Sequence, residues 1–143
     1  MTTRPLLALL VALLVVPGSL ACVPKPKQDY TIEQLARLES LEELMRVQAA
    51  TADPLFAKRK QSTYTEDEFQ GMYRGALRLR AAATSLRDRF GKKFPARFAG
   101  FASQLLDGAT ALENAAASKL EQRAAAALES MRQACAGCHR AFK

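Results

Sequence analysis

Apolar residues recur every three or four positions in four stretches of this chain, which is the spacing of one face of an α-helix. No stretch alternates strictly between apolar and polar residues, as a half-buried strand would. The pattern therefore predicts an all-α fold. It is clearest over residues 65–90, where the apolar positions are Phe69, Met72, Ala76, Leu79, Ala83, Leu86 and Phe90.

Capping residues indicate where these four helices begin. Thr31 and Thr65 are each followed three residues later by Gln or Glu, which is the capping-box pattern, and Ser118 is followed by a glutamate at the same spacing. Pro95 suits the first turn of the third helix, because its fixed backbone angle is already helical. We therefore expect helices to start near these four residues.

Breaking residues indicate where the first two helices end. Pro54 is expected to disrupt or end the first helix, and Gly91 to terminate the second. Steps of three and four sustained over four helices favour shallow crossing angles. Residues 31–143 have the length of one domain. The sequence thus predicts an antiparallel four-helix bundle over this range.

A five-residue motif lies close to the C-terminus. Residues 135–139 read Cys-Ala-Gly-Cys-His, and C-x-x-C-H is the attachment sequence of a c-type haem. Helical residues three and four apart share a face, so Cys135 and Cys138 can each form a thioether to a haem vinyl group while His139 binds the iron. The motif predicts one covalent haem c as cofactor, inside the bundle.

Two other uses of the motif fit the sequence less well. A structural zinc site usually needs four ligands and a second pair, and His139 is the only histidine in the chain. A thioredoxin-like dithiol expects a βαβ context, which the helical pattern does not provide. Covalent attachment of haem is therefore the favoured interpretation of the motif.

The apolar stripe that leads to this motif consists largely of alanine, including an unbroken run over 124–127. Alanine fills little volume, and a planar apolar macrocycle against the stripe would supply the missing bulk. We therefore expect the haem-free chain to be loosely packed.

The N-terminal segment is typical of an exported protein. Residues 1–21 combine a short positive start, an apolar run over 6–16 and small residues before Cys22, which together indicate a secretory signal peptide. The apolar run is too short to span a bilayer. Export fits the predicted cofactor, because bacteria attach c-type haem outside the cytoplasmic membrane. We therefore expect a periplasmic location.

The end of that segment together with Cys22, Ser-Leu-Ala-Cys at 19–22, resembles the lipobox of bacterial lipoproteins, in which the cysteine is acylated. Ser19 stands where leucine is more usual. Ordinary cleavage after Ala21 is the alternative. Acylated Cys22 would anchor the protein to a membrane, and residues 22–30 would form a stiff basic tether before the domain.

Charge and the remaining side chains restrict the partners. The formal net charge is +7, so the surface could meet an anionic membrane or an acidic redox protein. Nucleic acid is not expected outside the cytoplasm. The sequence shows no acid–base pair or nucleophilic triad, and its single histidine is already assigned to iron, so it predicts no enzyme.

A four-helix pattern with C-x-x-C-H in the last helix resembles the cytochrome c-prime family, the class II c-type cytochromes. The ending over 138–143 is similar to the family's ending, with Phe142 in place of the usual tyrosine. The resemblance implies a haem between the helices, His139 as the fifth iron ligand, and a first-helix residue facing the other side of the iron. It also implies a homodimer, because family members often pair through their first two helices.

Two residues of the first helix compete for the other side of the iron. Met45 there would give a six-coordinate haem that transfers electrons at a raised potential. In the second register Leu41 faces the iron, and Arg37 matches an arginine that family members often carry near a haem propionate. Leucine does not bind iron, so a coordination site would stay vacant for nitric oxide or carbon monoxide. Met45 would then be a core methionine, as we expect of Met72 and Met131.

Three hypotheses about function follow. The first is a monohaem cytochrome that carries single electrons between redox proteins in the periplasm. The second is a five-coordinate haem protein that binds small gases. The third is a lipoprotein whose cysteine pair binds a metal or cycles a disulfide without haem.

Overall fold

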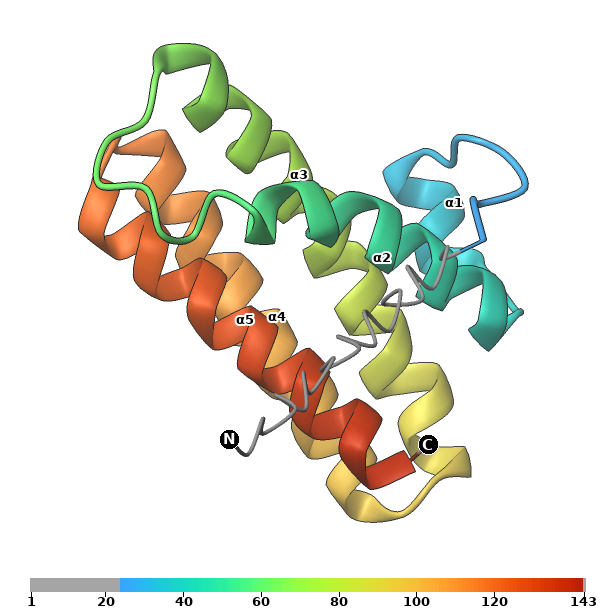
Figure 1. Cartoon of the computed structure of the whole chain (residues 1–143). Helices are drawn as coiled ribbons and strands as arrows, with labels where there is room; N and C mark the ends of the chain where they lie inside the picture. The colour runs from blue at the N-terminus through green and yellow to red at the C-terminus, as the bar shows by residue number, and fades with distance from the viewer. Residues whose placement is uncertain (1–23, 143) are drawn as a thin grey trace, which may run out of the picture.

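A computed structural model describes residues 24–142 of the chain (Figure 1). The predicted signal peptide at 1–21 and Cys22 lie outside the described residues. All regular secondary structure in the described part is helical, which confirms the predicted all-α fold. In chain order the elements are α1 (Ile32–Arg37), α2 (Leu41–Phe56), α3 (Glu66–Ser85), the π-helix η1 (Leu86–Phe90), the 3₁₀-helix η2 (Gly91–Lys93), α4 (Ala96–Ala117) and α5 (Glu121–Phe142).

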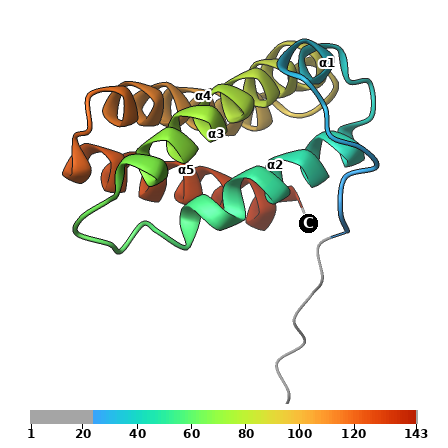
Figure 2. The same cartoon turned by 90° about the horizontal axis from the view of Figure 1, so that it is seen from above.

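The four long helices form two layers, with α3 and α4 in one and α2 and α5 in the other (Figure 2). Helix α4 packs along its length on both α3 and α5, whereas α2 packs mainly on α3 and touches α5 much less. The core lies between the layers. Its largest fully buried side chains are Leu44, Met72, Leu79, Leu112, Leu128 and Met131.

Two glycines allow the helices of the core to approach one another. A Cβ on Gly108 of α4 would lie 2.5 Å from Met131 Cγ of α5. A Cβ on Gly75 of α3 would lie 2.7 Å from Leu55 Cδ1 of α2. Each glycine therefore provides the space into which the neighbouring helix places a large side chain.

The first predicted helix is divided into α1 and α2. Leu38 has an extended backbone with ψ of 122°, and Ser40 then caps a new helix by accepting a hydrogen bond from Glu43 N at 3.2 Å. Arg89 of η1 donates to the carbonyl of Leu38 at 3.4 Å and so satisfies a group that the break exposes. The apolar spacing continues through the break, and for that reason the pattern did not reveal it.

Pro54 lies inside α2, which continues to Phe56. Proline has no backbone N–H, so α2 lacks one helical hydrogen bond at Pro54. The cost is limited because the helix ends only two residues later. Pro54 therefore does not end α2 where it stands, and the helix ends half a turn beyond it.

The second predicted helix leaves the α conformation before Gly91. Residues 86–90 form a π-helix, in which the N–H of Gly91 donates to Leu86 O, and Gly91 begins the 3₁₀ turn. The wider turn keeps both Leu86 and Phe90 buried, at 4% and 5% exposed. A Cβ on Gly91 would lie 3.1 Å from Ala99 Cβ, so glycine lets the start of α4 approach closely.

Ser118 does not cap the fourth helix as predicted. It ends α4, and Lys119 follows with a positive φ of 53°. The N–H of Lys119 donates to Ala116 O at 3.2 Å and that of Leu120 to Ala115 O at 2.9 Å, which together form a Schellman motif. Helix α5 then begins at Glu121, two residues later than a helix capped by Ser118 would.

Part of the predicted tether packs on the helices. The backbone N–H of Lys27 donates to Glu43 Oε1 at 2.6 Å, and Tyr30 donates its hydroxyl hydrogen to the same oxygen at 3.1 Å. The hydrogen bond from Lys27 holds the pKa of the Glu43 carboxyl below its usual value. Tyr30 also joins a small buried cluster with Leu35 and Val47. None of the described helices has the length and apolar character needed to span a membrane.

Candidate haem site

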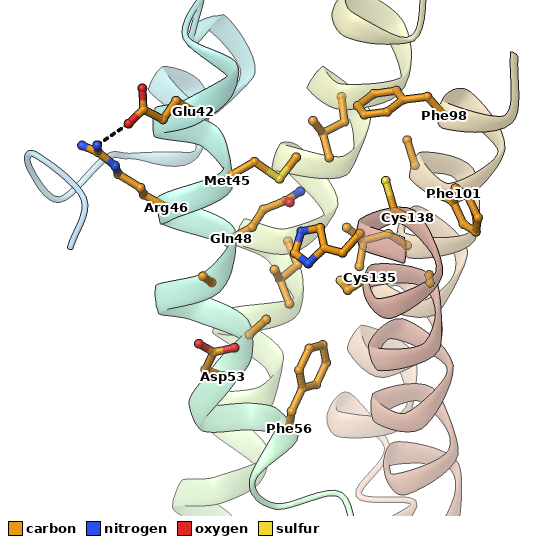
Figure 3. A pocket seen from close by; sticks show the side chains of 18 of the residues that line it. Glu42, Met45, Arg46, Gln48, Asp53, Phe56, Phe98, Phe101, Cys135 and Cys138 are labelled. Atoms are coloured by element: carbon orange, nitrogen blue, oxygen red, sulfur yellow. Dashed lines mark hydrogen bonds and ion pairs between the residues drawn. The ribbon is translucent and has the colours of Figure 1, made fainter. Parts of the chain in front are cut away.

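A cavity of about 350 Å³ lies between α2 and α5, with α3 and α4 behind it (Figure 3). This volume lies within the range of about 300–1,000 Å³ that is usual for ligand and cofactor sites. Apolar and small side chains make up most of its walls. They include Met45, Ala49, Ala52, Phe56, Leu79, Leu86, Phe98, Phe101, Ala102, Leu105 and Ala134.

All three residues of the predicted attachment motif line this cavity. Cys135, Cys138 and His139 occupy the last turns of α5, where their spacing of three and four residues gives them a common face. Figure 3 shows both thiols on the α5 side of the space, opposite α2. The structure therefore brings together the side chains that would hold a haem.

The glycine inside the motif has a packing role that the sequence did not reveal. A Cβ on Gly137 would lie 2.7 Å from Phe101 Cε1 of α4. Gly137 thus lets the motif turn of α5 lie directly on α4, while the cysteines face the cavity. The sequence does not indicate this role, because the middle residues of C-x-x-C-H are formally free to vary.

The two thiols are free and are held in their neutral form. Burial raises the pKa of Cys135 to about 11, with smaller contributions from Cys138 and from the Asp53 carboxylate across the cavity. Burial also raises the pKa of Cys138. Dithiols that cycle a disulfide have lowered thiol pKa values, so this environment is the opposite of a redox dithiol site.

The α2 wall presents Met45 and Gln48 to the cavity. Figure 3 shows both side chains extending from α2 toward α5, as expected for residues three apart on a helix. The sequence left Met45 and Leu41 as alternatives for this position, and Met45 is the one that reaches the cavity. The other methionines of residues 24–142, Met72 and Met131, are fully buried in the core, as predicted.

Leu41 and Arg37 do not line the cavity. Leu41 is half-buried and packs against the core from the first turn of α2. Arg37 is exposed and belongs to α1. Because the break at 38–40 separates them, the two residues do not share a helix face as the second register requires.

A different arginine lines the cavity. Arg46 is half-buried and forms ion pairs with Glu42 and, at 3.5 Å, with Glu43. It is therefore the arginine of the cavity lining that a carboxylate of a guest could contact, which is the role that the family resemblance implies for Arg37. The pair Glu42 and Arg46 at a spacing of four was visible in the sequence, but the pattern read equally well as an exposed helix face.

Gln48 carries an unsatisfied polar group beside the cavity. Its side chain is only 7% exposed, and Nε2 has no hydrogen-bond partner among residues 24–142. An orphaned buried donor costs about 1–3 kcal/mol. A guest with an acceptor atom near the α2 wall would remove this cost.

The residues present fit a covalent haem. Two neutral thiols and an imidazole line one wall, the opposite wall offers a thioether and an orphaned amide donor, an arginine is among the lining residues, and the remainder is apolar. Comparison with known proteins adds nothing to this fit, since no family model, curated protein or solved structure matches the chain.

Proposed function

We propose that this protein is a monohaem c-type cytochrome that carries single electrons. The observation that carries the proposal is the convergence of Cys135, Cys138 and His139 on one mostly apolar cavity whose far wall presents Met45. The proposed class is the one that the sequence resembles, the class II c-type cytochromes, with α2 to α5 as an antiparallel four-helix bundle around the haem.

Each residue has a separate task in this proposal. Cys135 and Cys138 would hold the haem covalently, and His139 and Met45 are the residues that would bind its iron. When bound, the haem supplies the one-electron chemistry. The apolar walls keep water away, and the thioether of Met45 raises the reduction potential. Arg46, although already paired with Glu42 and Glu43, is the arginine of the cavity lining that a propionate could contact.

The sequence alone supports the rest of this proposal. It includes export to the periplasm, a lipid anchor at Cys22 and redox proteins as partners. A homodimer is implied by the family resemblance only. Mass spectrometry of the mature N-terminus tests the anchor, because acylation adds the mass of the lipid to residue 22.

A five-coordinate protein that binds small gases is the second candidate. The orphaned amide donor of Gln48 favours it, because a donor on the α2 wall could hydrogen-bond to a diatomic ligand. Disulfide cycling, one form of the third hypothesis, is disfavoured because both thiols have raised pKa values.

Expression of the full chain in a host with c-type haem maturation tests the proposal. We expect a Soret band that persists after extraction with acidified acetone, and a mass that includes one haem. Replacing Cys135 and Cys138 with serine should abolish covalent attachment. A mature protein without covalent haem would overturn the proposal.

The axial ligand is tested separately. The wild-type spectrum should be that of low-spin iron, and Met45→Leu should convert it to high-spin. Met72→Leu is the matched control, because Met72 is fully buried away from the cavity, and it should leave the spectrum low-spin. High-spin iron in the wild type would instead favour the gas-binding candidate.

A further inference from the structure

We infer that an acidic redox protein docks on one end of this molecule and exchanges electrons with it there; this rests on the proposed function. We call this surface the basic end. It consists of Lys92, Lys93, Phe94, Arg97 and Arg140, and it lies where the connection between α3 and α4 meets the last turns of α5 (Figure 1).

Two stretches of sequence without acidic residues meet at the basic end. Residues 89–106 contain no Asp or Glu, and neither do residues 130–143, although both contain several cations. The stretches are joined directly, because Arg97 donates to the carbonyl of Ala141 at 3.1 Å and the ring of Phe98 packs on that of Phe142 at 5.5 Å. Positive charge from both therefore accumulates on one surface.

The cations of the basic end are exposed and form no ion pair with any carboxylate of residues 24–142. Lys93 lies over the ring of Phe90 at 5.5 Å, and Arg97 over the ring of Phe142 at 4.9 Å. Such contacts orient a cation without neutralising it. Several cations elsewhere are paired, as Arg80 is with Glu113 and Lys119 with Glu66. The field of the basic end is therefore available to a partner.

Aromatic rings connect this surface with the cavity. Phe94 is 39% exposed, and its ring stacks on that of Phe98 with 4.7 Å between centroids. Phe98 is buried and lines the cavity. Electron tunnelling weakens steeply with distance, so a partner must approach the haem closely. Two stacked rings span the interval from the cavity wall to the surface.

An apolar aromatic side chain surrounded by unpaired charges is typical of a protein–protein docking site. The aromatic centre provides contact area, and the surrounding charges speed association with a partner of opposite sign. A membrane surface is less suitable, because interfacial binding requires a broad apolar helix face, whereas here one ring is half-exposed and held in a stack. The partner therefore carries an acidic patch beside its own redox centre.

Stopped-flow oxidation of the reduced full-length holoprotein tests the inference. The probes are ferricyanide, a trianion, and tris(phenanthroline)cobalt(III), a trication. The variant Lys92→Glu/Lys93→Glu should slow the reaction with ferricyanide about tenfold at low ionic strength and speed that with the cobalt complex. Salt should remove both effects by screening.

The matched control is Arg74→Glu/Arg123→Glu. It changes the net charge equally, and both arginines are exposed, unpaired within the described part of the chain and distant from η2. We expect it to change either rate less than twofold. Equal effects of the two variants would show that only net charge matters and would overturn the inference.

The aromatic route is tested by Phe94→Leu, which keeps an apolar surface but removes the stacked ring. It should slow oxidation by ferricyanide at every ionic strength without changing the salt dependence. An unchanged rate would remove Phe94 from the route and overturn this part of the inference.

Vesicles of phosphatidylcholine with and without phosphatidylglycerol test the membrane as an occupant. If Lys92→Glu/Lys93→Glu abolishes the binding that depends on phosphatidylglycerol and the control variant does not, the basic end binds anionic lipid and the inference is overturned. The absorption spectrum separates the two proposals. Covalent haem with unchanged rates overturns only the docking surface, whereas a protein without covalent haem overturns both.

Discussion

The two neighbours of α5 meet it in opposite ways. On the α4 side, Gly108 and Gly137 lie under Met131 and Phe101, and the helices pack along their lengths. On the α2 side, small residues such as Ala49 and Ala134 line a cavity. Small side chains thus allow close contact at one interface and leave a space at the other.

The connections and supports of the helices explain this difference. The tight Schellman turn joins α4 to α5 and fixes them as neighbours. Helix α2 reaches α3 through the longer segment 57–65, and its Leu55 is seated against Gly75 of α3. Because α2 is held by α3 rather than by α5, the alanines and cysteines on the facing surfaces do not close the gap.

The largest expected difference in stability comes from shortening one side chain on the α4 side of α5 and one on the α2 side. Leu128→Ala on the buried side of α5 should lower the free energy of unfolding of the haem-free protein by about 2–5 kcal/mol, because it creates a cavity in a packed core. Met45→Ala should cost less than about 1 kcal/mol, since Met45 already borders an open space. Urea denaturation measures both, and equal losses would contradict the comparison.

Adding side chains tests the same contrast from the other direction. Gly108→Val should destabilise the haem-free protein by about 1–3 kcal/mol, because the new Cβ would lie 2.5 Å from Met131 Cγ. Ala49→Val, which adds volume on the cavity wall, should change stability by less than about 0.5 kcal/mol. Thermal unfolding followed by circular dichroism distinguishes the two. A large loss from Ala49→Val would show that the α2 side is as tightly packed as the α4 side.

Removing the orphaned donor should stabilise the haem-free protein. Gln48→Leu takes away a buried amide without a partner and should raise the free energy of unfolding by about 1 kcal/mol. Gln70→Leu is the control, because Gln70 is exposed and hydrogen-bonded to Glu66, so no gain is expected. A loss of stability in Gln48→Leu would show that the amide is satisfied in solution.

The smallest effect concerns the charge state of the cavity. In the haem-free protein, alkylation of Cys135 by iodoacetamide should rise with pH around a midpoint of about 11. Asp53→Asn should lower this midpoint, because a nearby carboxylate disfavours the thiolate. Peptide mass spectrometry measures the modification at each pH. An unchanged midpoint would show that the Asp53 carboxylate does not affect the pKa of the Cys135 thiol.

The sign of the linked stability follows from the same pKa. The folded protein keeps Cys135 neutral above the ordinary thiol pKa of about 8.5, so folding holds the proton more tightly than the unfolded chain does. Stability contributed by the neutral thiol is complete below about pH 8.5 and is lost as the pH rises toward 11. Cys135→Ala should remove this alkaline loss.

The local parts of the candidate site could be predicted from the sequence. The spacing of Cys135, Cys138 and His139 gives them a common face on any α-helix, and the three do line one cavity. Arg46 and Gln48 could not be found in this way. Whether a polar residue on a helix faces solvent or a cavity depends on the neighbouring helices, which periodicity does not describe.

The sequence likewise predicted the presence of the helices better than the residues at which they begin and end. The apolar periods predicted the long helices correctly, because burial of one face is encoded at fixed spacing. The break at 38–40 and the turn at 118–120 were missed. Arg89 supports the first from a distant element, and the positive φ of Lys119 defines the second, so neither depended on local preference alone.

The sequence by itself determined that the chain is helical and that two thiols and an imidazole share one helix face, since both follow from the fixed geometry of the α-helix. Only the tertiary structure decided that α2 stands apart from α5 and that Met45, rather than Leu41, borders the space between them. The physical reason is that the rotation and distance of a helix depend on contacts with all its neighbours at once. In this protein those contacts are mainly with α3.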